Sequence, residues 1–510
     1  MQDISDEKLA RMEKKIFLAR PQLKKIKKDY GDLSYFEYSK RKNRLNPNKN
    51  LRTRKTEAVS VIKNEVQRLL GTAVASSVER QLKDNDSVST AEHSAPISTP
   101  DMLNSALHST VGMFGSDKPH LQNLIILSCS GVSFSNTLSF SRGFLYHFFT
   151  KGHINNNQLT FFGRANDAKT VFNAPPYTIN NIIDMKNRLE SLGREGHLEQ
   201  KEVDKLRLML DNIYSVPHPL TATDYGDQLT ITNYFFWKSL FSSYKRHVPD
   251  YIMLSQEKIV LKLLINYHLQ QDTIIHRLLF NPDFHPLIEK YFEGITGAFT
   301  KDHSYGTFLF WGISKDNHRI QLFRKGNQLI SKDRTYSVAL EPNAITGAIQ
   351  NKELIPGLML TFILLSFYYG LLLGGGASQP TYLTAMKKAY IAMLQELKET
   401  TAIEDCSKTP TDDFVFFRPH LAFIEAYEQS IDATGLDMYL YSDPSFLKSI
   451  IEATKSISVA DFMTLLLPVL YKQFCPADQK EDDLTQITRM DIQKYLGLDK
   501  KIPPISSLSS

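Results

Sequence analysis

Four consecutive apolar residues, Leu124 to Leu127, constrain the fold of this chain more than any other feature. The run has the length of a strand and no polar position that could face water. Strands of that kind lie inside mostly parallel sheets, which helices cover on both faces. Tyr251–Leu254 repeats the pattern, and Ser255-Gln256-Glu257 and an apolar-periodic helix over Lys258–Leu269 follow it, which is the order of a βα unit.

Other segments carry helix and turn signals. Apolar residues recur at three- and four-residue spacing over residues 56–83 and predict one amphipathic helix. Residues 87–100 are rich in Ser, Thr and Pro, which predicts a loop that ends at a helix start, Thr99-Pro100-Asp101. Residues 307–331 contain tight turns between apolar runs and predict two hairpins. We expect the chain after Pro342 to be mostly helical.

A typical domain has roughly 100–200 residues, so a chain of 510 residues is expected to have several lobes. We divide it into a basic N-terminal arm (1–55), an amphipathic helix (56–88), an α/β core (89–300), and a hairpin plus helical C-terminal half (301–510) that completes the same body. The predicted fold class is α/β, with a mixed, mainly parallel sheet and many helices. A basic helical N-terminal extension and a mostly helical C-terminal part are added to it.

Positive charge is concentrated at the N-terminus. Residues 1–55 hold 17 Lys and Arg against 7 Asp and Glu, whereas the other residues hold 43 against 48. Lys24–Lys28 and Lys40–Arg44 are the densest basic runs. Such runs can bind nucleic acid or anionic lipid, or they can be a solvated arm that keeps the protein in solution. A polyanion is therefore a candidate partner of residues 1–55.

The cysteines and the N-terminus bear on the compartment. Cys129, Cys406 and Cys475 are odd in number and far apart, which excludes a disulfide framework and a cysteine zinc site. Free cysteines fit a reducing compartment. Residues 1–20 are charged throughout and lack the apolar stretch of a secretory signal. We therefore expect a cytoplasmic protein.

One stretch raises the question of a membrane. Leu354–Met386 contains no charge, and its apolar centre, Leu358–Leu373, is sixteen residues long. A membrane-spanning helix needs about 20 apolar residues. We expect a buried core helix here, and a single span over residues 356–374 is the alternative.

The candidate ligand site follows the first strand. In parallel α/β sheets, ligands bind beyond the carboxyl ends of the strands. The loop after Leu127 reads Ser-Cys-Ser-Gly-Val-Ser-Phe-Ser-Asn-Thr and matches no glycine-rich phosphate motif. We expect Ser128, Ser130 and Asn136 to offer hydrogen-bonding groups to a polar or anionic ligand, and Arg142 to supply a fixed positive charge. A Ser-rich surface turn is the alternative.

Proton transfer near neutral pH points to histidine. The candidates are His147 and His93, which stands beside Glu92 in the loop before the predicted helix start at Thr99. His93 could instead be a solvated loop histidine. Cys129 as a nucleophile is weaker, because a buried cysteine at a strand end usually serves packing.

Two further features of the sequence could bind a ligand or a metal ion. Gly374-Gly375-Gly376 could let the backbone approach a ligand or could simply end a helix. His268, Asp272 and His276 share one stripe of a helix and could hold a divalent ion, but the polar surroundings favour a solvated face. We predict no metal site, and the sequence identifies no cofactor.

These observations predict a cytoplasmic enzyme that binds a small polar or anionic metabolite, of transferase or ligase type. The alternative is a binding or effector-type protein that attaches to anionic membrane or nucleic acid through its basic N-terminal arm. The oligomeric state stays open.

Overall fold

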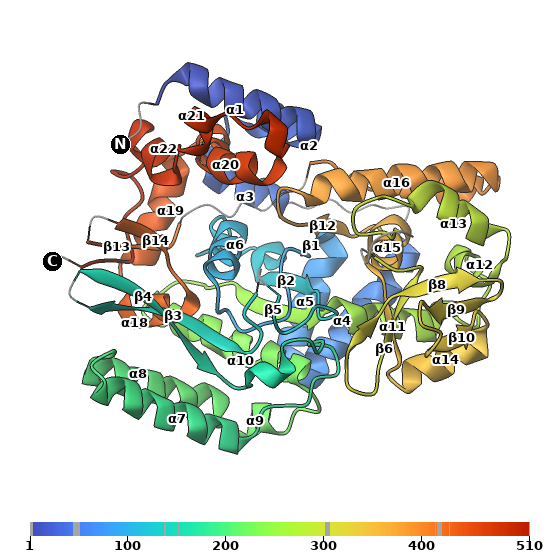
Figure 1. Ribbon diagram of the computed structural model, residues 1–510, viewed down its shortest axis with the longest axis horizontal. Coiled ribbons are helices and arrows are strands. Elements are labelled where there is room, and N and C mark those ends of the chain that lie inside the picture. The colour runs from blue at the N-terminus through green and yellow to red at the C-terminus, as the bar shows by residue number, and fades with distance from the viewer. Residues whose placement is uncertain are drawn as a thin grey trace.

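The computed structural model describes residues 4–43, 52–136, 139–150, 152–300, 306–413, 415, 421–427 and 429–508 (Figure 1). A parallel sheet of four strands lies in the middle of the molecule, with the strand order β12-β1-β2-β5. The strands are β1 (Ser87–Ser89), β2 (Asn123–Ser128), β5 (Asp250–Ser255) and β12 (Leu372–Gly374). The predicted class, mixed α/β with a mainly parallel central sheet and many helices, is confirmed.

The two faces of this sheet belong to two different hydrophobic cores. On β2, Leu124 and Ile126 face the first core, whereas Ile125 and Leu127 face the second. Successive residues of a strand point to opposite faces, so an uninterrupted apolar run suits a strand that is covered twice. All four side chains are at most 4% exposed, which confirms the predicted interior strand.

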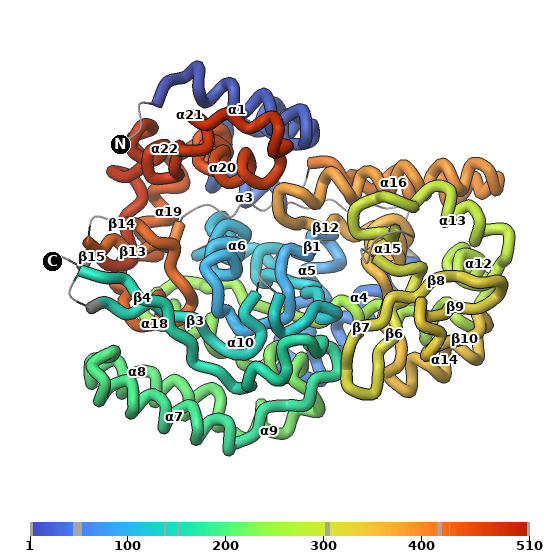
Figure 2. The backbone as a smooth tube through the Cα atoms, in the orientation of Figure 1, coloured from blue at the N-terminus to red at the C-terminus, as the bar shows by residue number. Residues whose placement is uncertain are grey.

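The first core joins the two ends of the chain. Helices α1 (Asp6–Ala19), α2 (Pro21–Tyr30) and α3 (Tyr35–Lys42) pack beside α20 (Val459–Phe474), as the neighbouring blue and red tubes in Figure 2 show. The Leu33 carbonyl accepts the Val459 amide at 2.9 Å, and the Ile457 carbonyl accepts the Tyr35 amide at 2.8 Å. The basic N-terminal segment is therefore built into the body through its apolar residues.

The remaining elements of the first core lie on the same face of the sheet as helix α6. The elements on this side are α6 (Pro100–Thr110), β3 (Gly143–Thr150), β4 (His153–Thr160), α7 (Ile179–Arg194), α8 (Gln200–Met209), α9 (Pro217–Leu220), α10 (Tyr225–Leu240), β13 (Phe423–Ala426), β14 (Gln429–Asp432), α18 (Gly435–Tyr441), α19 (Phe446–Ser456), α21 (Asp482–Thr485), α22 (Arg489–Tyr495) and β15 (Ser506–Leu508). Strands β3 and β4 form a separate antiparallel hairpin. Helix α10 also contributes Ile231 and Tyr234 to the second core.

The second core fills the other lobe. Its helices are α4 (Arg52–Leu70), α5 (Thr72–Asp84), α11 (Gln256–Leu263), α12 (Ile274–Phe280), α13 (Phe284–Phe292), α14 (Pro342–Gln350), α15 (Leu358–Phe362), α16 (Gln379–Glu396) and α17 (Thr400–Ser407). Its short strands are β6 (Phe310–Ile313), β7 (Arg319–Ile320), β8 (Leu322–Lys325), β9 (Gln328–Ser331), β10 (Ser337–Ala339) and β11 (Leu354–Pro356). The pairs β6–β7 and β8–β9 are antiparallel, as the two predicted hairpins require.

Two predictions about local structure were wrong. The segment 87–100 begins with β1, a central strand, although its serines predicted a loop. Hydrogen bonds to strands on both sides outweigh the low strand propensity of serine in so short an element. The single helix over 56–83 is divided at Gly71, whose φ of 89° is left-handed and breaks the helix between α4 and α5.

The uncharged stretch 358–373 is core structure. It forms α15, then one π-helical turn over Ile363–Tyr368, and it ends in β12. Every residue of the π-helical turn is buried, which confirms the core helix. Among the described residues, no helix combines the length and apolarity that crossing a membrane requires.

Candidate functional site

A carboxylate of the protein itself occupies the carboxyl end of β2. Glu257, in the first turn of α11, accepts the Ser130 amide at 2.9 Å and the Gly131 amide at 3.0 Å. It also accepts the Ser130 hydroxyl at 2.7 Å. The turn after β2 thus forms a concave group of donors, as anion-binding turns do. Glu257 is 2% exposed, and its carboxylate occupies the position that a bound anion would take among these donors.

The two predicted serines are used inside the fold. The Ser128 hydroxyl is fully buried, donates to the Leu254 carbonyl at 3.2 Å and lies 2.7 Å from the Ser94 hydroxyl. The Ser130 hydroxyl is shared between Glu257 and the Ser255 hydroxyl, which lies 2.6 Å away. Both serines tie neighbouring strand ends together.

Cys129 lies beside the same carboxylate. Its Sγ is 3.3 Å from Glu257 Oε1. Burial, together with the negative charge of Glu257, raises the pKa of the Cys129 thiol well above its usual value. The reactive form of cysteine is the thiolate. This environment therefore disfavours Cys129 as a nucleophile.

Arg142 and Asn136 line a separate cavity of about 300 Å³, which we call the Arg142 cavity. Its other lining residues are Thr99, Phe134, Ser135, Ser139, Phe140, Leu145, Gln158 and Asp167. The Arg142 side chain is 10% exposed, and its Nε lies 3.1 Å from Asp167 Oδ1. Its Nη2 makes a long contact of 3.4 Å to Gln158 Oε1. A guanidinium has five N–H donors, so these two contacts leave donors for an anion in the cavity.

His93 does not line this cavity but contacts Asn136, which does. His93 Nδ1 lies 2.8 Å from Asn136 Oδ1, and the His93 backbone pairs with Cys129 beside the end of β2. An amide oxygen only accepts hydrogen bonds, so His93 Nδ1 is the donor of this contact. The structure therefore brings together three of the predicted site residues, His93, Asn136 and Arg142.

His147 lies in a different arrangement. Its Nδ1 is 2.6 Å from Asp437 Oδ2, and its backbone amide donates to Asp437 Oδ1 at 2.8 Å. Asp437 is fully buried in the first turn of α18 and also accepts the Thr434 amide at 2.8 Å. Since β3 carries His147, this pair fastens the β3–β4 hairpin to α18. The structure does not place His147 on the Arg142 cavity.

Sequence reasoning missed the partners that define these sites. Glu257 carried a signal, because an acid in the first turn after one parallel strand can reach the loop after its neighbour. Asp167 and Asp437 carried none, since 25 residues separate the first from Arg142 and 290 separate the second from His147. Arg319 was also missed; it donates to the Gly131 carbonyl at 3.1 Å and stacks 4.0 Å from the centre of the Trp311 ring.

The triple glycine serves the protein's own packing. A Cβ on Gly375 would collide with the Gln379 side chain, which reaches back to bond Thr90 and the Leu373 carbonyl. The Gln379 side chain thus fills the space that the glycine leaves.

His268 donates to, or accepts from, the Tyr369 hydroxyl at 2.9 Å. Across the described residues, no group of three or more His, Cys, Asp or Glu side chains is arranged to hold a metal ion.

Many cations of the basic N-terminal segment have partners within the protein. Lys25 pairs with Asp412 at 2.8 Å, and Lys27 pairs with Glu13 at 2.5 Å. Arg11 forms an ion pair with Glu481. Arg44, at the end of the second basic run, lies outside the described residues. These pairs take up part of the charge that the sequence assigned to a polyanion.

Two comparisons with known proteins gave no match. No protein-family model matches the chain, and no curated protein matches its sequence.

Proposed function

We propose that the protein binds a small metabolite bearing a carboxylate or phosphate in the Arg142 cavity, as an enzyme of transferase or ligase type would. The observation that carries this proposal is the Arg142 guanidinium, which is nine-tenths buried and lines a cavity of about 300 Å³. Cavities of roughly 300–1,000 Å³ with a few convergent polar groups are typical of small-molecule sites.

The roles follow from the chemistry of each group. Arg142 pairs with the anionic group of the ligand, which replaces the half-exposed Asp167 as the ion-pair partner of the guanidinium. Asn136 lines the cavity and orients His93. His93 is the group that we assign to proton transfer, because imidazole is the side chain that most often serves as general acid or base. Ser128 and Ser130 do not line the cavity and are given no contact with the ligand.

A thermal-shift panel of nucleotides, sugar phosphates and dicarboxylates tests the proposal, because a ligand that binds only the folded state raises its melting temperature. Arg142→Ala should abolish any shift. Asp167→Asn removes the same ion pair but keeps the guanidinium, so it should preserve or strengthen the shift. Arg164→Ala removes an exposed arginine nearby and serves as the control. Equal loss of the shift in the Arg142 and Asp167 variants would make Arg142 a structural residue and refute the proposal.

The alternative function, attachment to anionic membrane or nucleic acid through residues 1–55, receives less support. The helices of this segment pack into the first core, and several of its cations pair with carboxylates of the body. Lys24 and Lys28 are exposed on α2 and are the groups that would carry such binding.

A further inference from the structure

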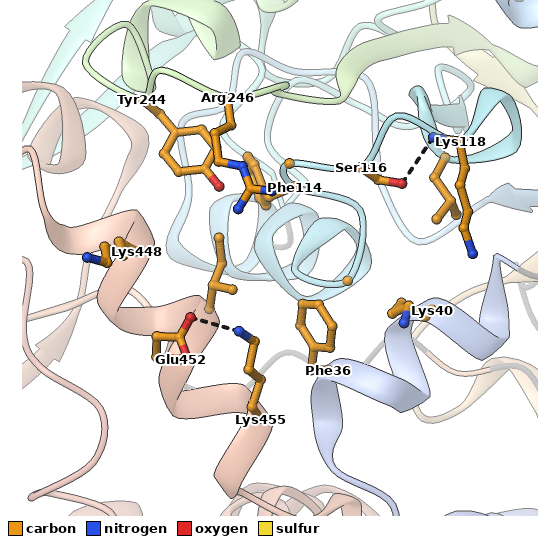
Figure 3. A pocket seen from close by; sticks show the side chains of 14 residues that line it. Phe36, Lys40, Phe114, Ser116, Lys118, Tyr244, Arg246, Lys448, Glu452 and Lys455 are labelled. Carbon is orange, nitrogen blue, oxygen red and sulfur yellow. Dashed lines mark hydrogen bonds and ion pairs between the residues drawn. The ribbon is translucent and has the colours of Figure 1, made fainter.

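A cavity of about 380 Å³, which we call the basic cavity, lies between four segments that are far apart in the sequence. Figure 3 shows Phe36 and Lys40 on α3 to one side of it and Lys448 and Lys455 on α19 to the other, with the nitrogen of Lys448 directed outward, while Arg246 and Lys118 come from two loops. The first loop precedes β5, and the second follows α6. The basic cavity shares no lining residue with the Arg142 cavity.

The lining is strongly cationic. It holds five basic side chains and one carboxylate, Glu452, which pairs with Lys455 at 2.7 Å. Lys118, Arg246 and Lys448 have no carboxylate within ion-pair distance among the residues that the structure describes. Lys40 pairs with Glu37 at 3.1 Å, so two of the five cations have a carboxylate partner and, in the described part of the chain, three do not. Like charges repel, so an anion that joins the three unpaired cations would be favoured. This excess stands out because the chain beyond residue 55 is slightly acidic as a whole.

An aromatic ring forms part of the wall. The ammonium groups of Lys40 and Lys455 lie 5.4 Å and 5.5 Å from the centre of the Phe36 ring. They approach it from α3 and α19, so the ring is held between cations from two helices. Cations within about 6 Å of an aromatic face are attracted to it. Phe36 also gives the cavity an apolar surface against which carbon atoms of a ligand can pack.

Two glycines fix the walls in place. Gly115 has a φ of 72°, and a Cβ there would come within 3.2 Å of Arg246 Nε. Its amide donates to the His247 carbonyl at 2.8 Å, which joins the two loops. A Cβ on Gly112 would come within 2.8 Å of the Lys40 backbone nitrogen. The close approach of these segments fixes the backbone positions from which the cations extend.

From these observations we propose that the basic cavity binds a small molecule or headgroup that carries at least two phosphate groups. Arginine guanidinium and lysine ammonium groups both bind phosphate commonly in proteins. The cations lie on separate walls, so one phosphate cannot reach all of them, whereas phosphates spread over a compact scaffold can. A concave cavity of this volume suits such a ligand better than the extended backbone of a nucleic acid duplex.

The test measures binding of inositol trisphosphate and inorganic tripolyphosphate to the full chain by calorimetry. Vesicles of phosphatidylcholine, with and without phosphatidylinositol bisphosphate, form the lipid arm. Lys118→Ala/Lys448→Ala should weaken binding of the soluble probes at least about tenfold, the loss expected when charge-assisted contacts are removed. Added salt should weaken binding by the unchanged protein as well.

The matched control is Lys472→Ala/Lys494→Ala, which removes two exposed charges from α20 and α22. It should bind like the unchanged protein. If the protein binds the soluble probes but not the vesicles that contain phosphatidylinositol bisphosphate, the ligand is a free molecule. If it binds the soluble probes and those vesicles, the ligand is a lipid headgroup. Three outcomes would each overturn the proposal. They are equal weakening in the two double variants, failure of the soluble probes to bind, and tighter binding of duplex DNA that depends on the same lysines.

Discussion

Glu257 accepts both the backbone amide and the hydroxyl of Ser130, at 2.9 Å and 2.7 Å, and thereby closes the carboxyl end of β2. An anion-binding turn of this kind usually faces a ligand at the edge of a parallel sheet. Here the chain fills it with its own carboxylate. The ligand site that we propose is displaced from the strand end to the Arg142 cavity beside it.

We expect Glu257→Ala to lower the free energy of unfolding by about 2–5 kcal/mol, because two buried amides and a hydroxyl would lose their acceptor. Denaturant titration measures this loss. Glu257→Gln keeps one acceptor oxygen and should cost less. Glu190→Ala, at an exposed position, should leave the midpoint almost unchanged. A neutral Glu257→Ala would show that solvent reaches these donors.

Acid should destabilise the protein through Asp227. Burial alone would raise the pKa of this carboxyl, but Arg68 and Lys258 outweigh burial and lower the pKa from 3.8 to about 2. Arg68 binds both oxygens, at 2.7 Å and 2.9 Å, and Lys258 binds Oδ1 at 2.7 Å. A lowered pKa stabilises the fold at pH above about 4, and that contribution disappears as the pH falls towards 2.

Unfolding free energies measured from pH 5 down to pH 2 would check this expectation. The lost contribution should be about 2 kcal/mol. Asp227→Asn should be less stable at pH 5 and should have a flatter acid limb. If the variant and the unchanged protein lose stability in parallel, other carboxylates govern acid unfolding.

Leu364→Ala should lower the free energy of unfolding by about 2–5 kcal/mol, because it opens a cavity in a fully buried turn. Leu364→Arg should prevent folding, since an unpaired charge in a packed core costs several kcal/mol. Leu208→Ala, at a position that is 56% exposed, is the control. Backbone amides of residues 358–368 should also exchange slowly with solvent. Rapid exchange there would contradict the core assignment.

The His147–Asp437 pair offers a test of which histidine belongs to the site. Asp437→Ala should destabilise the protein by several kcal/mol, because the His147 and Thr434 amides lose a buried acceptor. His147→Ala should cost less and should leave ligand-induced thermal shifts intact, whereas His93→Ala should alter them. Loss of the shift in His147→Ala alone would exchange the roles of the two histidines.

Part of this site could be predicted from local pattern. The run Leu124–Leu127 is apolar on both faces, so it predicted an interior strand and the loop that leaves it. Asn136 and Arg142 follow in the same loop region, and the structure places both on one cavity. His93 could be proposed from its chemistry, but its contact with Asn136 depends on β1, which was expected to be loop.

The sequence by itself determined what depends on neighbours along the chain. Apolar periodicity and capping residues, such as Ser458 with Asp461 at the start of α20, specify helices locally. The tertiary structure alone decided the short strands β1 and β12, because three residues acquire strand conformation only from pairing with a neighbour, β1 with β12 and β2, and the edge strand β12 with β1. It also decided the basic cavity, whose charges come from four segments separated by up to several hundred residues. Charge and hydrogen-bond complementarity act through space, and only the folded chain sets those distances.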